Sequence, residues 1–493
     1  MDRETTRHQW AARSLDLITS VENWRVQHPT ATLTAMEQAL DARLATLRVQ
    51  MLQDLALDSS TATWPTTPSP AAQCPTCSVP LRPRGRHRRR LRTHGGKHLV
   101  IHRSYGICPH CHRGFFPLDR ELALLPGAVT PSIQAHAAHL GTWLPFARAA
   151  AMLTTFTQVT LSESTVQRLT ETTGVAALAV AEAKVAHIQA VWPAVPPGPE
   201  TAVVSVDGAM VPLVGGDWAE VKTLAIGVVA PTAGDQASVI TDLSYMSRLL
   251  DAQQFQIATL GELHHRGIER AGQIVAVNDG APWIQGWVEF HCPTAVRILD
   301  FAHAAQRLAV LGQAEGPTAT AAARAWFARM QHRLKYDGMA AILAEVTAVA
   351  AAHPDPAARS EHLAYLVKRV DQMAYPTFQA AGWPIGSGIV ESANKLVVEA
   401  RLKGAGMHWA RASVNPMLVL RNAVCNDRWR EIWGASAAHI RQHGRVGRTI
   451  TSKPSSAPLP PPELPPPPPP PQVQVQVHPW RRYGQKLSSR AKT

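Results

Sequence analysis

Residues Ala202-Val203-Val204-Ser205-Val206-Asp207-Gly208 form an apolar run that ends in an acidic residue. A second apolar run, Ile274-Val275-Ala276-Val277-Asn278, leads in the same way to Asp279. Short runs rich in β-branched residues predict buried strands. In neighbouring strands of one sheet, Asp207 and Asp279 can lie side by side, at strand ends or centres. Two carboxylates so placed can share Mg²⁺ (or Mn²⁺), a hard ion that prefers oxygen ligands.

Further strands and helices are predicted on both sides of the second run. Strand-like segments are residues 223–229, 294–299 and, more weakly, 237–243; helices are predicted for residues 247–265 and 282–288. Three strands, a helix, a strand, a helix and a strand is the order of a ribonuclease-H-like α/β fold. Residues 301–380 are Ala-rich and predicted to be almost wholly helical. Glu391 follows on another predicted helix, residues 387–400, and can complete a two-metal site.

Each of these acids also has a simpler interpretation. Asp207-Gly208 and Asn278-Asp279-Gly280 are hairpin-turn signals when apolar residues flank them. A lone glutamate on a helix is usually a solvated residue. Asp217 and Glu220 are the nearest rival acids and have the sequence context of turn or edge residues.

Asp300 and His303 follow the last predicted strand and share one face of a helix. The pair can bind a metal or touch a phosphate, which makes His303 a candidate catalytic residue. The alternative is an aspartate that caps the helix beside a surface histidine.

Two Cys-x-x-Cys pairs, Cys74–Cys77 and Cys108–Cys111, lie about thirty residues apart. Two such turns supply four thiolates for a structural Zn²⁺, and residues 98–104 can form the hairpin of a zinc ribbon. The alternatives are two unrelated cysteine pairs or a redox pair. Four nearby histidines are further possible ligands: His87, His94, His98 and His102.

The formal charge is +13 and the pI about 9.8, which is typical of nucleic-acid-binding proteins but also of ribosomal and membrane-surface proteins. From residue 59 to 118 there is no Asp or Glu. The arginines that crowd this stretch are candidate DNA contacts, in the backbone or the minor groove: Arg86, Arg88, Arg89, Arg90 and Arg92.

With 493 residues the chain is expected to be a multidomain α/β protein. We expect a helical region at 1–58 that dimerises or packs, a linker at 59–73, the zinc ribbon at 74–118, and a helix-turn-helix-like DNA-binding region at 119–180 with Arg168 on its second helix. A disordered, proline-rich basic tail is expected at 440–493. No run of eighteen apolar residues and no signal-peptide core occurs, so a cytoplasmic location is expected.

Between about residues 70 and 435 the chain resembles the ISKra family of bacterial insertion-sequence transposases, within the Mutator-like group of DDE enzymes. The motifs that carry this resemblance are the two cysteine pairs, Val206-Asp207-Gly208, Asn278-Asp279-Gly280-Ala281-Pro282-Trp283-Ile284, Asp300-Phe301-Ala302-His303, Gly386-Ser387-Gly388 with Val390-Glu391-Ser392, and Arg401-Leu402-Lys403-Gly404-Ala405-Gly406-Met407. The proline-rich tail is not part of the family pattern.

The resemblance implies that Asp207, Asp279 and Glu391 are catalytic and bind Mg²⁺, and that Asp300 and His303 fill a [C/D]xxH motif. It implies a catalytic domain at 201–300 and 385–430, interrupted by a helical insertion at 301–384. Lys403 is a further candidate DNA contact. The expected activity is metal-dependent cleavage at the inverted repeats of an element and strand transfer into target DNA by a homodimer or larger assembly. An inactive DNA-binding regulator and a structure-specific nuclease on the same fold are the alternatives.

Overall fold

The computed structural model describes residues 3–230, 238–313, 319–352 and 356–443. The tail predicted to be disordered at 440–493 begins too early, because residues 440–443 are the end of helix α18 (Trp429–His443). The rest of the tail lies outside the described residues. The chain divides into two compact units. Of the described residues, the first unit holds those up to Ala176 and those from Arg430 to His443, and the second holds those from Ala177 to Trp429. All are parts of a mixed α/β protein with two sheets.

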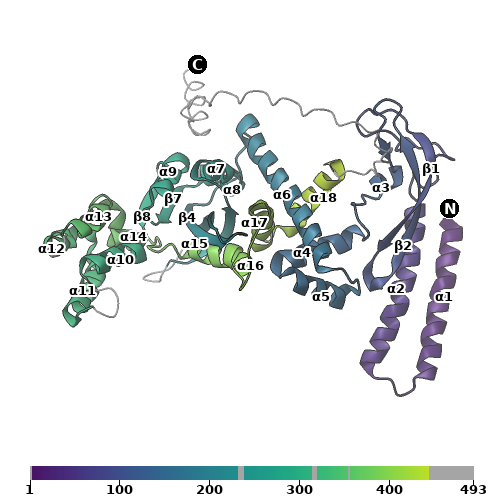
Figure 1. Ribbon diagram of the computed structural model, residues 1–493, viewed down its shortest axis with the longest axis horizontal. Helices are drawn as coiled ribbons and strands as arrows, with labels where there is room; N and C mark the ends of the chain where they lie inside the picture. The colour runs from purple at the N-terminus through teal and green to yellow at the C-terminus, as the bar shows by residue number, and fades with distance from the viewer. Residues whose placement is uncertain (1–2, 231–237, 314–318, 353–355, 444–493) are drawn as a thin grey trace. The chain divides into compact units, whose positions relative to one another are not determined.

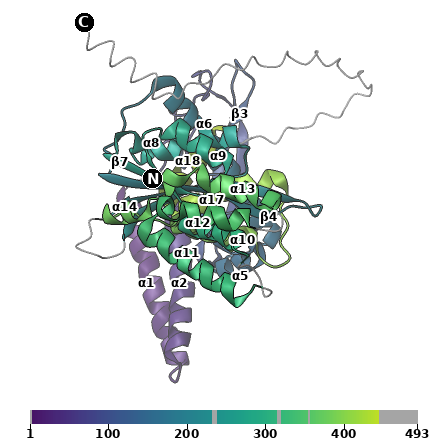
Figure 2. The ribbon, with the colours of Figure 1, turned by 90° about the vertical axis from the view of Figure 1, so that its left-hand side faces the viewer.

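The first unit begins with two long helices, α1 (Arg3–Gln27) and α2 (Leu33–Leu57), as the sequence predicts for this region. They lie side by side in both views of the chain (Figures 1 and 2). Thr32 caps α2, since its hydroxyl accepts a hydrogen bond from the backbone N–H of Ala35. Trp10 Nε1 donates to Asp54 Oδ2 at 2.9 Å and ties the two helices together.

A three-stranded antiparallel sheet follows, in the order β1 (Arg82–Arg92), β2 (His98–Ile107) and β3 (Gly114–Phe115), and α3 (Pro117–Glu121) comes next. The predicted hairpin at 98–104 is part of β2. Within the predicted linker at 59–73, Ala62, Trp64 and Ala72 are buried in the apolar clusters of the ribbon. Composition suggested a linker because most of the segment is Ser, Thr and Pro, yet its few apolar side chains cover the small ribbon.

The predicted helix-turn-helix elements are present as α4 (Pro131–Trp143), α5 (Phe146–Thr157) and α6 (Glu163–Val191). Gln158 adopts a left-handed conformation that ends α5, and Ser162 Oγ accepts from the N–H of Thr165 at the start of α6. Buried side chains from all three helices, Ile133, Leu153 and Val166 among them, form one core. Helix α6, the second helix of the predicted helix-turn-helix, is longer than predicted and continues past Ala176, where the first unit ends.

Of the described helices, α6 alone is long and apolar enough by length and composition to cross a membrane. The indication is weak, because a helix that packs within a protein core meets the same criterion. Arg168, Glu171 and Lys184 also interrupt its apolar residues.

The second unit is built on a five-stranded sheet with the strand order β6-β5-β4-β7-β8. Strands β4 and β5 are antiparallel, as are β5 and β6, whereas β7 and β8 run parallel to β4. The strands are β4 (Thr201–Pro212), β5 (Trp218–Val229), β6 (Ile240–Arg248), β7 (Gln273–Asn278) and β8 (Val296–Leu299). The predicted order is therefore confirmed, except that Ser247 and Arg248 end β6 rather than begin a helix, and residue 237 lies outside the described residues.

Side chains on the two faces of β4 alternate between two helical layers. Ala202, Val204 and Val206 face α7 (Ala252–Ala258), α8 (Leu260–His265) and α9 (Pro282–His291), and pack there around Trp287. The opposite face carries Asp207 and is covered by α15 (Gly388–Ala393), a π-helical turn η4 (Asn394–Glu399) and α17 (Arg411–Cys425). The short α16 (Ala400–Leu402) joins η4 to the loop before α17.

The segment between β8 and α15 is helical, as predicted, and gathers beside β8 (Figure 1). Its elements are α10 (Phe301–Leu311), α11 (Ala321–Asp337), α12 (Met339–Ala351), α13 (Pro356–Val367), the 3-10 turn η3 (Val370–Met373) and α14 (Tyr375–Ala380). Tyr375 is buried and donates from Oη to the carbonyl of Leu299 at 2.9 Å, which joins this helical segment to the last strand of the sheet.

Candidate functional site

Asp207 lies within β4 and not at its end. It pairs with Thr223 of β5, and the strand continues for five residues to Pro212. The β4–β5 turn comes later, at Gly215 (φ 100°) and Gly216 (φ 90°), so the interpretation of Asp207-Gly208 as a hairpin turn is wrong. Because side chains alternate along a strand, Asp207 projects from the same face as Val203 and Ser205.

Asp279 directly follows β7, in the crossover to α9. A hairpin turn at this position is also excluded, because β7 pairs with parallel strands on both sides. The register that pairs Val204 with Ala276, continued along both strands, brings Asp207 beside Asp279. The side-chain carbonyl of Asn278, which accepts from the N–H of Val206, holds the two strands together at this point.

Glu391 lies in α15 and is exposed, three residues before the buried Asn394. Asn394 Nδ2 donates a 2.8 Å hydrogen bond to Asp207 Oδ2. The helix that carries Glu391 is thereby attached to the strand that carries Asp207. Sequence reasoning missed Asn394, although its position one turn after Glu391 was a usable signal.

The charges of Asp279 and Glu391 both act on the carboxyl group of Asp207. Burial raises the pKa of Asp207, and the charges of Asp279 and Glu391 raise it further, while His303 opposes them. Across the described residues, the three acids do not converge tightly enough to form a preformed cage for a single ion. A two-metal site needs a wider spread, because its ions lie about 3.5–4 Å apart.

Asp300 begins α10 and is almost wholly buried. Its Oδ1 accepts from the backbone N–H and the Nδ1 of His303, both at 2.9 Å, and its Oδ2 accepts from the N–H (2.7 Å) and hydroxyl (3.0 Å) of Ser387. Burial opposes ionisation, but these four bonds lower the pKa of Asp300 to about 2. The simpler prediction of a helix-capping aspartate is thus confirmed, and Asp300 also connects α10 to the segment before Glu391.

His303 is half-exposed, at 44% of its side chain. The hydrogen bond to Asp300 raises its pKa against the effect of burial, and the charges of Asp279 and Asp207 act in the same direction. The imidazole therefore lies close enough to the two strand acids to sense their charge. Its protonated form is a potential donor to an anion at this edge of the sheet.

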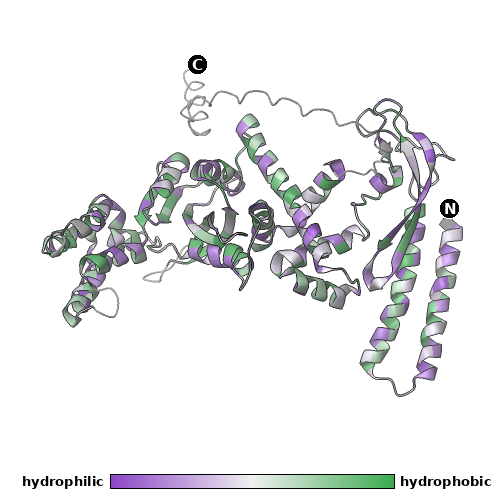
Figure 3. Cartoon of the chain, viewed as in Figure 1, coloured by the Kyte–Doolittle hydropathy of each residue, from purple (hydrophilic) through white to green (hydrophobic). Residues whose placement is uncertain are grey.

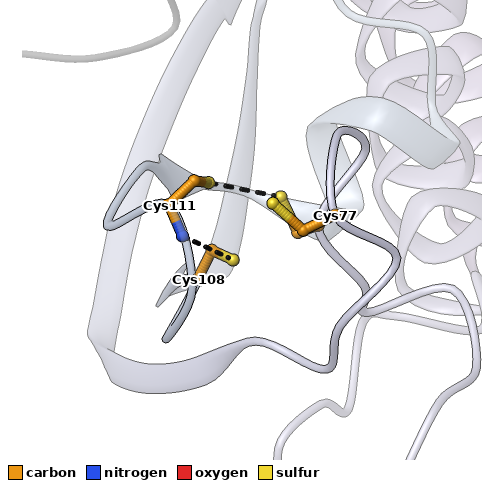
Figure 4. Close-up of side chains that lie close together, drawn as sticks. Cys77, Cys108 and Cys111 are labelled. Carbon is orange, nitrogen blue, oxygen red and sulfur yellow. Dashed lines mark hydrogen bonds between the residues drawn. The ribbon is translucent and has the colours of Figure 1, made fainter.

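The second candidate site is the cysteine cluster in the first unit. Cys74, Cys77, Cys108 and Cys111 place their four sulfur atoms within 4.8 Å of one another, and they can bind a metal ion such as zinc. Figure 4 shows three of these side chains, from two separate loops, with their sulfur atoms turned toward one another. The cluster contains none of the four histidines considered above.

The two cysteine loops have the same backbone geometry. The N–H of Ser78 donates to the carbonyl of Cys74 (2.9 Å) and that of His112 donates to Cys108 (3.0 Å). Both donors have a positive φ, 55° and 57° respectively. Burial raises the pKa of Cys74, but hydrogen bonds from backbone groups and neighbouring thiols outweigh it and lower the pKa to about 7. This repeated turn favours a metal ligand set over two unrelated cysteine pairs.

The arginine-rich strand β1 separates its side chains onto two faces. Arg86, Arg88 and Arg90 are exposed on one face, opposite His102 and Val100 of β2. The strand is hydrophilic along almost its whole length (Figure 3). Burial lowers the pKa of His98, and the charges of Arg90 and Arg92 lower it further, which shows how dense the positive charge is here. We call Arg86, Arg88 and Arg90 the basic face of β1.

Two of the predicted DNA contacts are turned inward. Arg89 donates from Nη1 to Asp119 (2.8 Å) and from Nη2 to the carbonyl of Leu125, and Arg92 donates to the carbonyl of Thr160. Arg89 lies on the face opposite Arg86, Arg88 and Arg90, because alternate residues of a strand face opposite sides. Arg92 shares the face of these three arginines, and its guanidinium is held by the carbonyl of Thr160. Arg168 is exposed on α6, and Lys403 pairs with Glu399 at 2.7 Å.

Comparison of the chain with protein-family models and with curated proteins finds no match. What the protein does must therefore be argued from the two sites themselves. The side chains that sequence reasoning missed at the acidic site, Asn394 and Ser387, both act by hydrogen bonding to an acid that it did single out.

Proposed function

We propose that this protein is a DNA transposase of the DDE type, related to the ISKra family, which cuts and joins DNA at Asp207, Asp279 and Glu391. The observation that carries the proposal is the meeting of the three acids. Asp207 and Asp279 come from adjacent parallel strands, and Glu391 comes from the helix bonded to Asp207 through Asn394. The charges of Asp279 and Glu391 both raise the pKa of Asp207.

The order and direction of the strands support a ribonuclease-H-like fold for the second unit. Three antiparallel strands are followed by two parallel ones, with β4 at the centre of the sheet. In this interpretation the helices α10–α14 are an insertion between β8 and the helix that carries Glu391. The fold supports the proposal only together with the acids, because one fold hosts many functions.

The donor set fits a hard divalent ion, since it consists of carboxylate oxygens. A cation there would also offset the charges of Asp279 and Glu391, which raise the pKa of Asp207. When bound, Mg²⁺ or Mn²⁺ supplies the positive charge that activates an attacking oxygen and stabilises a leaving one. Asp207, Asp279 and Glu391 would hold the ions. Asn394 orients Asp207, and the imidazolium of His303 can donate to a phosphate oxygen.

The reaction has two phosphoryl transfers. In the first, water attacks a phosphodiester at the end of the element and the 3′-oxygen leaves as a free hydroxyl. In the second, this hydroxyl attacks a phosphorus of the target DNA, and the target's own 3′-oxygen leaves. The protein's basic groups, above all the basic face of β1, would hold the DNA. A homodimer or larger assembly would pair the two ends of the element.

The proposal is tested with the full-length protein and a plasmid that carries the element's ends. Asp207→Asn, Asp279→Asn and Glu391→Gln should each abolish Mg²⁺-dependent cleavage and strand transfer while DNA binding in a gel-shift assay persists. Asp217→Asn, an exposed turn acid in the same unit, is the matched control and should remain active.

Three results would count against the proposal. Near-normal cleavage by any of the three variants would remove that acid from the site. Binding without cleavage by the wild-type chain would favour a DNA-binding regulator. Cleavage of branched DNA without joined products would favour a structure-specific nuclease.

A further inference from the structure

The turn that carries Asp279 is held by the helices inserted after β8. Gly280 donates its N–H to Tyr365 Oη at 2.9 Å, and its carbonyl accepts from Arg369 Nη2 at 2.7 Å. Tyr365 belongs to the last turns of α13, and Arg369 follows that helix. Both backbone polar groups of one residue in the β7–α9 turn are therefore bound by side chains that come from more than eighty residues away.

The two side chains that hold Gly280 also support each other. Arg369 Nη1 donates to the carbonyl of Tyr365 at 3.0 Å, and its guanidinium carbon lies 3.9 Å from the centre of the Tyr365 ring. Arg307 of α10 lies 4.6 Å from the same ring centre. Cation–π contacts of this kind restrict both partners. We call Tyr365 and Arg369 the α13 clasp.

The clasp leaves room only for glycine at position 280. A Cβ on Gly280 would overlap the Tyr365 hydroxyl and Arg369 Nε. Its backbone φ lies outside the left-handed range, so the requirement comes from the neighbouring side chains and not from conformation. The close fit indicates that the turn and the end of α13 are packed as one piece.

The turn in question sets the direction of the Asp279 carboxylate. Asp279 Oδ1 accepts from the N–H of Ala281 at 2.9 Å, so the side chain is fixed to the backbone on the far side of Gly280. The clasp holds the residue between the two ends of that bond. A shift of Gly280 would therefore move both the Asp279 backbone and the donor that orients its carboxylate.

We propose that Tyr365 and Arg369 are positioning residues that fix Asp279 for metal binding, so that the inserted helices act on the acidic site. This inference rests on the proposed function, because it takes Asp279 to be a metal ligand. Groups that orient a ligand matter because metal affinity depends on placement within fractions of an ångström. Their loss typically weakens metal binding about 10–100-fold.

The test measures metal binding directly and without DNA. Mn²⁺ is titrated into the full-length protein, and the free ion is followed by its electron paramagnetic resonance signal. Asp279→Asn should remove the site. Tyr365→Phe and Arg369→Gln should each weaken Mn²⁺ binding about 10–100-fold, and Gly280→Ala should do the same by displacing the clasp.

The matched control is Tyr375→Phe. Tyr375 is also an inserted tyrosine bonded to the backbone of the sheet, but its partner is the Leu299 carbonyl and not the Asp279 turn. This variant should lose thermal stability and keep wild-type Mn²⁺ affinity. Arg369→Lys serves where Arg369→Gln does not fold, since it keeps the charge but cannot reproduce the paired hydrogen bonds to Gly280 and Tyr365.

The outcomes separate the inference from the function on which it rests. If Asp279→Asn binds Mn²⁺ like the wild type, the metal site itself fails. If Asp279→Asn loses the ion while Tyr365→Phe keeps wild-type affinity, the clasp is structural only and the inference is overturned. The double variant Gly280→Ala with Tyr365→Phe should bind Mn²⁺ no more weakly than the single variant with the lower Mn²⁺ affinity, since both substitutions act through one contact. Additive losses of Mn²⁺ affinity would contradict a single clasp.

Discussion

Single side chains decide which acids at the edge of the sheet stay charged. Asp207 has one side-chain donor, Asn394, and two acidic neighbours, and its pKa is raised. Asp300 has four donors, and its pKa falls to about 2 although it is more buried. The four hydrogen bonds to Asp300 thus outweigh its burial, whereas at Asp207 the effects of burial and of the two acidic neighbours outweigh the backbone hydrogen bond from Gly208.

Asp300→Asn should destabilise the second unit at neutral pH. The pKa of the folded state, about 2, is below the ordinary 3.8, so the charged form stabilises the fold above pH 3.8 and this contribution disappears as the pH falls through 2. The shift corresponds to at most about 2 kcal/mol. Because Asp300 raises the pKa of His303, the stability lost in the variant should be larger at pH 5, where His303 is protonated, than at pH 8. Denaturant unfolding should then show a smaller difference below pH 4, as Asp300 itself becomes protonated.

The control for this comparison is Asp217→Asn, an exposed acid in the β4–β5 turn. It should leave the free energy of unfolding unchanged at all these pH values. A difference between Asp300→Asn and the wild type that does not shrink in acid would mean that the variant acts through packing and not through the charge of Asp300.

At this scale, the sequence predicted the acids better than their partners. Alternation along a strand and the matching of two apolar runs were enough to place Asp207 and Asp279 together. The partners of Gly280 lie in α13 and just after it, and no local pattern links positions so distant. The bonds of Arg89 to Asp119 and Leu125 were not predicted for a related reason, since the direction of its side chain depends on the pairing of β1 with β2.

Among the elements, α17 protects the edge of the sheet with three asparagines. Asn415, Asn422 and Asn426 each accept from the N–H and donate to the carbonyl of one residue of the β6 edge: Leu249, Ser247 and Tyr245. The helix thus satisfies backbone groups that a further strand would otherwise bind. An exposed sheet edge invites pairing with another chain, and these side chains cover it.

Asn422→Ala should destabilise the second unit by about 1–3 kcal/mol, because it leaves the buried N–H of Ser247 unpaired. The carbonyl of Ser247 loses one donor but still accepts from Arg248 Nη1. The measurement is urea unfolding of the full chain, followed by a signal from the second unit. Asn23→Ala, an exposed asparagine of α1, is the control and should stay within about 0.5 kcal/mol of the wild type. Equal effects of the two substitutions would show that the contacts with β6 contribute nothing.

The two faces of β1 give a matched pair of variants. Replacing Arg86, Arg88 and Arg90 with alanine should weaken binding to any DNA and reduce the slope of log affinity against log salt by about 0.9 for each phosphate that is no longer neutralised. Arg89→Ala should instead lower the stability of the ribbon, since Arg89 is bound to Asp119. Fluorescence anisotropy at several salt concentrations measures the first effect, and thermal unfolding the second. An unchanged salt slope in the triple variant would contradict a phosphate-binding face.

The predicted elements hold where the apolar period is clear, as in β4, β7 and α5. They fail where a few side chains are decisive. In residues 59–73, Trp64 packs beside Cys74 and Leu81 and turns a linker-like composition into part of a folded ribbon. The π-helical turn after Glu391 was also not predicted, since an added residue in a helical turn leaves no periodic signal.

At the scale of the whole molecule, the chain divides into two compact units, each with one candidate metal site. The four cysteines lie in the first unit, in a ribbon whose apolar cluster is small. The three acids lie in the second, on a sheet with an extensive core of its own. The two units should therefore differ in what a metal ion does for their stability.

Calorimetry of the full chain should show two unfolding transitions that respond to different metals. Removal of zinc by a chelator, or Cys108→Ser, should lower the unfolding temperature of the first unit and leave that of the second unit unchanged. The reason is that a small ribbon depends on its metal for folding energy. Mg²⁺ should raise the temperature of the second unit's transition only. At a hundred times its dissociation constant it should add about 2.7 kcal/mol to the free energy of unfolding of that unit. Asp279→Asn should abolish the effect of Mg²⁺ and retain the effect of the chelator. A single transition that follows both metals would contradict the independence of the two units, and zinc retained by Cys108→Ser would exclude the four-cysteine site.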